Sequence, residues 1–252
     1  MGRSHHRLAT ATVEPVELIE ALRTTGAVRE FEPEPVADDV VERILDTARF
    51  APNGGNRQGW RVVLVKDPDV RTAMRDCYLD GWYEYLAQAA AGLVPWAVVT
   101  DREAEKRAVQ DAPALAAEAA RGPGGLAEHL DDVPVMLVLL ADLRVLAAVD
   151  RDLGRYTMAG GASIYPFAWS ILLAARADGL AGVMTTMAIR DEARAKEILH
   201  VPEELVIAGL IVLGHPVHQP KKLRRAPVGQ FTTVDRSDGP AFGASIDTGS
   251  RA

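Results

Sequence analysis

Cysteine is nearly absent from this chain, and long hydrophobic runs are missing altogether. The single cysteine, Cys77, excludes an internal disulfide, and its helical surroundings predict a small apolar filler. The longest apolar runs, residues 133–141 and 205–213, fall far short of the roughly 20 residues that a membrane-spanning helix needs. Residues 1–13 have no apolar segment of the kind that a secretory signal contains. We therefore predict a disordered lead-in over 1–13 and a cytoplasmic protein that does not bind membranes.

Positive charge and several well-known motifs are also scarce. The formal net charge is −7, which argues against a nucleic-acid partner, because phosphate contact requires clustered Lys and Arg. The six histidines are scattered without a cysteine or carboxylate cluster, so we predict no metal site. The chain has no Gly-x-Ser-x-Gly elbow and no Walker loop. It also lacks Gly-x-Gly-x-x-Gly after the first predicted strand, so a Rossmann NAD site is not expected.

Hydrophobic periodicity, in contrast, is pronounced. Hydrophobic residues make up 48% of the chain, enough for a sizeable core. Apolar residues at three-and-four spacing predict helices, and continuous apolar runs predict strands that are buried on both faces. The predicted helices cover about residues 15–24, 38–50, 69–91, 163–178 and 192–199, and the predicted strands 60–66, 134–141, 181–184 and 204–213.

Few strands among many helices favour an α+β sandwich with helices on both faces of a sheet. The helix at 163–178 has almost no polar face, which predicts burial in a core or between subunits. An Ala-rich stretch, 92–132, is broken by Gly-Pro-Gly-Gly and is typical of a helical cap with a flexible joint, so we assign about 78–130 to a lid. We predict one domain over 14–236 and a flexible tail over 237–252.

The most informative stretch is residues 51–65, Ala-Pro-Asn-Gly-Gly-Asn-Arg-Gln-Gly-Trp-Arg-Val-Val-Leu-Val. Asn56 and Gln58 each offer an amide donor and a carbonyl acceptor. Gly54 and Gly55 let the backbone come close to a flat ligand. The loop therefore suits a polar heterocycle or its polyol tail. An ordinary helix-to-strand turn would explain the same residues.

Two cationic elements could bind a phosphate. Arg23 and Arg29 flank a turn after the first predicted helix, and residues 221–227 read Lys-Lys-Leu-Arg-Arg-Ala-Pro. Arginine is suited to bidentate phosphate binding. Taken alone, both elements are more typical of solvated surface than of a binding site, and residues 184–186, Met-Thr-Thr, are typical of a strand-end turn.

In this order, these elements resemble the FMN-dependent nitroreductase family over about residues 16–236. Four residues match the family pattern Pro-Ser-x-x-Asn-x-Gln-Pro-Trp: Pro52, Asn56, Gln58 and Trp60. Asn53 stands in place of the Ser, and Gly59 stands in place of the second Pro. The second half of Arg-Arg-Ser-x-Arg-x-Phe is matched by Arg29 and Phe31. Thr25, Gly26 and Ala27 replace its first half.

The resemblance implies which residues contact the flavin. Lys222 and Arg224 have the spacing of the family's C-terminal Lys-x-Arg segment, which reaches the FMN phosphate. We propose that Arg23 replaces the phosphate-binding arginine that the family has in the first half of its Arg-Arg-Ser pattern and that this chain lacks. Residues 184–186 fall where backbone amides lie near flavin N5. Trp169-Ser170 replaces the usual Gln-Asn pair. The implied cofactor contacts are Arg23, Thr25, Arg29, Pro52, Asn53, Gly54, Asn56, Gln58, Met184, Thr185, Thr186, Lys222 and Arg224.

The resemblance further implies a three-layer sandwich around a mostly antiparallel sheet and a homodimer with FMN at the subunit interface. Hydride would pass from NAD(P)H through flavin N5 to a small acceptor, such as a nitroaromatic or quinone, in a ping-pong cycle. The flavin would carry the chemistry, so no catalytic side chain is expected. Two alternatives stay open. One is another flavin reaction on the same scaffold: dehydrogenation, reductive dehalogenation or flavin fragmentation. The other is a flavin-binding protein without turnover.

Overall fold

The computed structural model describes residues 16–243. The chain divides into two compact units, Met1–Pro220 and Lys221–Ala252. The predicted lead-in, 1–13, and residues 244–252 of the predicted tail lie outside the described residues. The domain limits at 14 and 236 stay predictions. The elements are α1 (Leu18–Thr24), α2 (Asp38–Ala48), β1 (Trp60–Leu64), α3 (Pro68–Ala90), α4 (Arg102–Ala108), α5 (Ala112–Ala119), β2 (Val135–Asp142), α6 (Tyr165–Ala177), β3 (Ala181–Thr185), α7 (Glu192–Ile198) and β4 (Leu205–Gly214).

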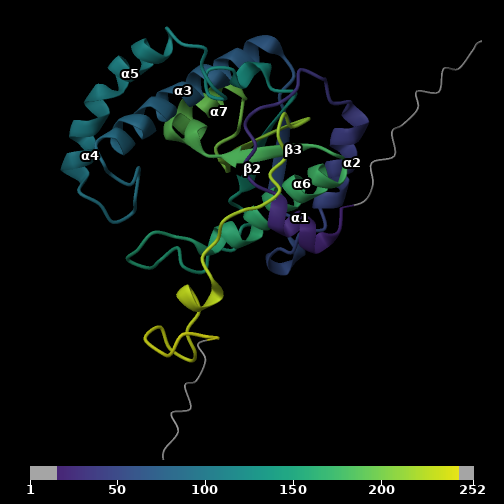
Figure 1. The fold of residues 1–252 in the computed structure, drawn as a ribbon, viewed down its shortest axis with the longest axis vertical. Helices are drawn as coiled ribbons and strands as arrows, with labels where there is room; N and C mark the ends of the chain where they lie inside the picture. Colours follow the sequence, from purple (N-terminus) through teal and green to yellow (C-terminus); the bar gives the residue numbers. More distant parts are fainter. Residues whose placement is uncertain (1–15, 244–252) are drawn as a thin grey trace, which may run out of the picture. The chain divides into compact units, whose positions relative to one another are not determined.

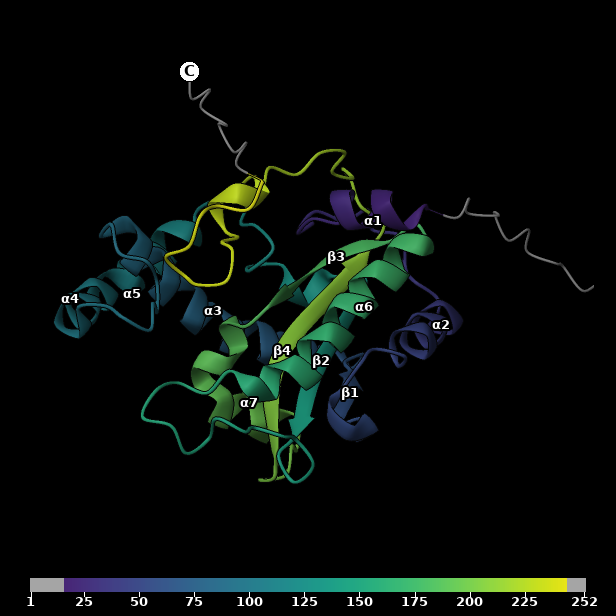
Figure 2. The ribbon, with the colours of Figure 1, turned by 90° about the horizontal axis from the view of Figure 1, so that it is seen from below.

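The first unit is built around an antiparallel sheet with the strand order β1-β2-β4-β3. Helices α2 and α6 cover one face of this sheet, and α3 and α7 cover the other (Figures 1 and 2). Strand β2 is buried along its whole length. The predicted α+β sandwich with helices on both faces is confirmed.

Alternate residues of β2 enter two separate hydrophobic cores. Leu137 and Leu139 pack with α2 and α6, whereas Met136 and Val138 pack with α3 and α7. All four side chains are fully buried. Successive side chains of a strand point to opposite faces, so a strand between two cores has to be apolar at every position. This requirement explains why the uninterrupted apolar run at 134–141 predicted a buried strand.

Local side-chain chemistry sets the ends of several helices. The Asp67 carboxylate accepts hydrogen bonds from the N–H groups of Asp69 and Val70 at 3.0 and 3.1 Å and so caps α3. Gly179 follows α6 with φ +75°, a conformation that ends helices and favours glycine. Helix α6 begins at Tyr165, slightly later than predicted, because the 3₁₀ turn η4 (Ala159–Ser163) precedes it.

Residues 92–132 contain the two short helices α4 and α5, which lie along the second half of α3 (Figure 1). A small apolar cluster joins α5 to α3 through Tyr83, Ala87 and Ala112. The predicted break at 122–125 falls between α5 and β2 and contains Gly124 at φ +69°. The role of this region as a lid stays a prediction.

The second unit, as far as it is described, contains the 3₁₀ turn η6 (Val228–Gln230) and one antiparallel bridge between Thr233 and Ala241. Lys222 and Arg224 are exposed in it. Within residues 16–243, no helix combines the length and the apolar character that crossing a bilayer requires.

A close contact between α3 and the turn η5 (Met187–Asp191) generates a prediction about stability. A Cβ atom on Gly81 would lie 2.6 Å from the carbonyl oxygen of Met187 and 3.0 Å from the Cβ of Arg190. Since the backbone would have to move, we expect Gly81→Ala to lower the free energy of unfolding by about 1–3 kcal/mol. Denaturant titration measures this change. Gly154→Ala is the matched control, because nothing lies within 4 Å of its added Cβ, and should stay within about 0.5 kcal/mol of the unsubstituted protein. Equal unfolding midpoints for the two variants would contradict the close packing.

Candidate functional site

A cavity of about 280 Å³ lies between α3 and the end of β3. It brings together Arg29 and residues 184–186, which are far apart in the sequence and were all predicted as site residues. Trp82 and Tyr85 stack with ring centroids 5.5 Å apart. The cavity is lined by Arg29, Tyr78, Trp82, Tyr85, Leu126 and residues 183–187. An aromatic wall with a few polar groups at one side suits a planar heterocycle.

Tyr78 is a cavity residue that no sequence motif marks. Its hydroxyl lies 3.2 Å from the Thr185 hydroxyl, and its side chain is 4% exposed. Burial raises the pKa of Tyr78, while the bond to Thr185 and the charge of Arg29 act in the opposite direction. The phenol therefore stays protonated at neutral pH. One sequence signal could have found it, because positions 78, 82 and 85 are all aromatic and lie on one helix face.

The loop before β1 is held by its own side chains. The Asn53 Oδ1 accepts a hydrogen bond from the Gln58 N–H at 2.9 Å, and its Nδ2 donates to the Ala51 carbonyl at 3.2 Å. Asn56 and Gln58 have φ values of +52° and +51°, which residues other than glycine seldom adopt. Such strain is frequent at binding sites. The Asn56 and Gln58 side chains are exposed, whereas the polar atoms of Asn53 are used within the loop.

Contacts from distant segments fix the base of the same loop. The Gly54 N–H donates to the Ser163 hydroxyl at 3.0 Å. The Asp142 N–H donates to the Gly59 carbonyl at 2.7 Å. Two hydrogen bonds from the Arg144 guanidinium, at 2.8 and 2.9 Å, hold the pKa of the buried Asp142 carboxyl down to about 2. Asp142 is therefore a permanent charge that anchors this corner, and it is not suited to moving protons near neutral pH.

The loop and the cavity lie apart within one copy of the chain. Strands β1 and β3 are the two edges of the sheet, and three strand spacings of about 4.8 Å place these edges about 14 Å apart. No residue of 52–58 lines the cavity. The structure thus groups Arg29 with residues 184–186 and leaves Pro52, Asn53, Gly54, Asn56 and Gln58 elsewhere.

A third polar region follows α1. Arg23 is exposed in the last turn of that helix, and the Oγ1 of Thr25 is buried without a hydrogen-bond partner in the described part of the chain. Gln219 reaches the same turn, because its Nε2 donates to the Thr24 carbonyl at 3.1 Å, and its Oε1 is buried and unpartnered as well. Buried polar groups normally have partners, so these two atoms are available to a polar ligand. Gln219 has no motif around it that would have predicted this position.

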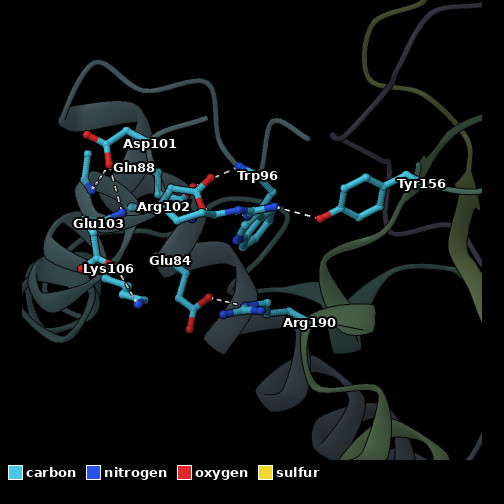
Figure 3. A network of polar contacts seen from close by, with 11 residues as sticks. Glu84, Gln88, Trp96, Asp101, Arg102, Glu103, Lys106, Tyr156 and Arg190 are labelled. Atoms are coloured by element: carbon cyan, nitrogen blue, oxygen red, sulfur yellow. Dashed lines mark hydrogen bonds and ion pairs between the residues drawn. The ribbon is translucent and has the colours of Figure 1, made fainter. Parts of the chain in front are cut away.

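The 92–101 loop extends the aromatic wall of the cavity. Trp96 has φ +52°, and its backbone N–H donates to the Gln88 side-chain carbonyl at 3.0 Å (Figure 3). The guanidinium of Arg190, which is paired with Glu84, lies 5.8 Å from the Trp96 ring centroid. The ring centroids of Trp96 and Tyr85 are 6.2 Å apart. Among the described residues, no group of histidine, cysteine and carboxylate side chains could hold a metal ion.

Comparisons with known proteins agree with one another. Residues 22–215 match the model of the Nitroreductase family. The chain is 27% identical over 218 residues to the NADH dehydrogenase of Thermus thermophilus, covering 86% of this chain and 96% of that protein. It is 26% identical over 220 residues to iodotyrosine deiodinase 1 of Pongo abelii, covering 86% of this chain and 68% of that protein. A crystal structure of oxidized iodotyrosine deiodinase bound to FMN and 3-iodo-L-tyrosine has a similar fold, with a TM-score of 0.57 at 20% identity, covering 86% of this chain and 100% of that one.

Proposed function

The chain belongs to the nitroreductase family of flavoenzymes, and from this premise we propose that it is an FMN-dependent NAD(P)H oxidoreductase that reduces a small acceptor such as a nitroaromatic or quinone. The observation that carries the proposal is the cavity in which Arg29 and residues 184–186 meet beside an aromatic wall. Bound FMN would supply the redox chemistry. The similarity to an NADH dehydrogenase and to an FMN-bound fold neighbour supports both the donor and the cofactor.

The residues present fit FMN at both of its ends. The aromatic side chains of α3 and the backbone of residues 184–186 can enclose a planar ring. The unpartnered polar atoms of Thr25 and Gln219 suit the polar tail. The family resemblance is the basis on which Lys222 and Arg224, with Arg23 for the missing cation, are proposed for the single terminal phosphate. FAD would add a pyrophosphate, for which the sequence has no Rossmann loop.

The contribution of the protein is binding and electrostatics. Arg29 would face the ring with a permanent positive charge, and fixed donors at the cavity wall stabilise negative charge on a bound ring. We assign no side chain the role of acid or nucleophile. Burial raises the pKa of Cys77, which keeps this thiol protonated behind the cavity wall.

We extend the proposal to a homodimer in which loop 52–58 of one copy completes the cavity of the other. Helices α1 and α6 lie side by side (Figure 2). Both expose large apolar side chains, since Leu18 and Ile19 of α1 are 64% and 60% exposed and Trp169 of α6 is 38% exposed. Such a surface is typical of a protein interface. One side of α6 packs in the core through Phe167 and Ile171. A partner on its other side would account for the absence of a polar face.

Two other functions compete with this proposal. Reductive dehalogenation is supported by the similarity to iodotyrosine deiodinase 1. A flavin-binding protein without turnover is supported by Thr25, Gly26 and Ala27, which stand where the family has Arg, Arg and Ser. The choice of acceptor would depend on the lid, whose Arg102 donates to the Tyr156 hydroxyl at 3.1 Å (Figure 3).

The first prediction for this function concerns the cofactor and its reduction. The purified protein should be yellow and should release FMN when it is denatured, as measured by chromatography. Anaerobic NADH or NADPH should bleach the flavin absorbance, and a quinone or nitroaromatic should restore it. Release of FAD, or of no flavin, would contradict the cofactor assignment. Bound FMN that stays oxidised would identify a binding protein, and recovery with halogenated aromatics alone would identify a dehalogenase.

The second prediction concerns the phosphate. If Arg224 reaches it, Arg224→Ala should weaken FMN binding by roughly ten- to a hundredfold, because a hydrogen bond to a charged group contributes about 1.5–3 kcal/mol. Arg225→Ala is the matched control and should have little effect, because Arg225 is exposed and its guanidinium donates to the Arg224 backbone carbonyl at 2.7 Å. FMN titration into the two apoproteins compares them. Equal affinities would show that the assigned register of the Lys-x-Arg segment is wrong.

A further inference from the structure

We propose that Tyr78 and Thr185 act as one hydrogen-bonded hydroxyl pair which, beside Arg29, donates to the carbonyl-bearing edge of the flavin ring. Tyr78 is thereby a positioning residue for the cofactor. This inference rests on the proposed function, because it takes FMN as the occupant of the cavity. It assigns a role to a side chain of α3 that none of the sequence motifs includes.

The two hydroxyls belong to residues that both line the cavity. Tyr78 comes from the middle of α3 and Thr185 from the last position of β3, and their oxygen atoms are 3.2 Å apart. Both residues line the cavity together with Arg29. The Tyr78 side chain packs in the core beneath α3, and the charged groups that act on its hydroxyl are Arg29 and Glu128. A buried hydroxyl at this place needs polar partners.

Counting hydrogen atoms shows that the pair has a donor to spare. Each hydroxyl carries one hydrogen, so one of the two donates to the other, and the hydrogen of the accepting hydroxyl is left for a further acceptor. No other hydrogen bond to either hydroxyl is found in residues 16–243. The Arg29 guanidinium likewise has neither an ion pair nor a hydrogen bond within the described structure, although it lines the same cavity.

The chemistry of the flavin ring selects which edge faces these donors. One edge of isoalloxazine carries two carbonyl groups and ring nitrogens, and the opposite edge carries methyl groups. A guanidinium and a free hydroxyl complement the carbonyl edge, whereas Trp82 and Tyr85 complement the ring face. The donors would hold the ring in one orientation and favour any state in which this edge carries negative charge.

The test is the binding of FMN by Tyr78→Phe, together with the reduction potential of the bound flavin. Loss of one hydrogen-bond donor, about 0.5–1.5 kcal/mol, should weaken FMN affinity about two- to tenfold. The potential should shift to a more negative value, which a merely structural loss would not cause. Thr185→Val should act in the same direction. The double variant should lose less FMN-binding free energy than the two single variants lose together, because the two hydroxyls act as a unit.

Tyr83→Phe is the matched control, because it makes the same change on the same helix at a side chain that does not line the cavity and whose hydroxyl donates to the Glu128 carboxylate at 2.9 Å. It should change FMN affinity less than twofold and leave the potential in place. An unchanged affinity and potential in both Tyr78→Phe and Thr185→Val would overturn the inference while leaving the proposed function intact. So would an equal effect of Tyr83→Phe. Failure of the unsubstituted protein to bind FMN would overturn the proposed function and this inference with it.

Discussion

The cavity exists because α3 crosses the segment after β3 at a distance that only glycine permits. Gly81 stands against the Met187 carbonyl oxygen, and Tyr78, Trp82 and Tyr85 flank this contact on the same helix. Any displacement of α3 from η5 would therefore widen the cavity and separate Tyr78 from Thr185. The contact in turn depends on β2, whose fully buried length fixes the two helical layers to opposite faces of the sheet.

Polar groups divide into those that hold the fold and those left available to a ligand. Asp142 with Arg144, and Glu84 with Arg190, are paired and anchor the loops at the two edges of the sheet. Thr25 and Gln219 each keep one unpartnered buried atom. The remaining atoms of that kind in the described chain belong to the lid region and to α6: Gln88, Glu105 and Arg176. Folded proteins satisfy most buried polar groups, and in the proposed complex the polar tail of the flavin would supply the partners of the unpaired atoms after α1.

Much of the architecture could be predicted from the sequence, because hydrophobic periodicity sets it locally. The apolar run at 134–141 predicted β2, and the helix predicted at 69–91 corresponds to α3, Pro68–Ala90. Side-chain orientation could not be predicted. Asn53 was expected to contact the cofactor, whereas its amide closes the loop, so its part in binding stays a prediction. The meeting of Tyr78 with Thr185 depends on tertiary packing, which no local pattern encodes.

In the proposed homodimer, one flavin site requires two copies of the chain. Heterodimers of two differently tagged variants test it most directly: one copy carries Arg29→Ala, and the other carries Asn56→Ala with Gln58→Ala. Each variant alone should bind FMN poorly, because every site has lost one component. The isolated heterodimer should bind one FMN per dimer, since the intact loop of the first copy faces the intact cavity of the second. A heterodimer that binds no more FMN than its parents would contradict the claim and place the complete site within a single chain.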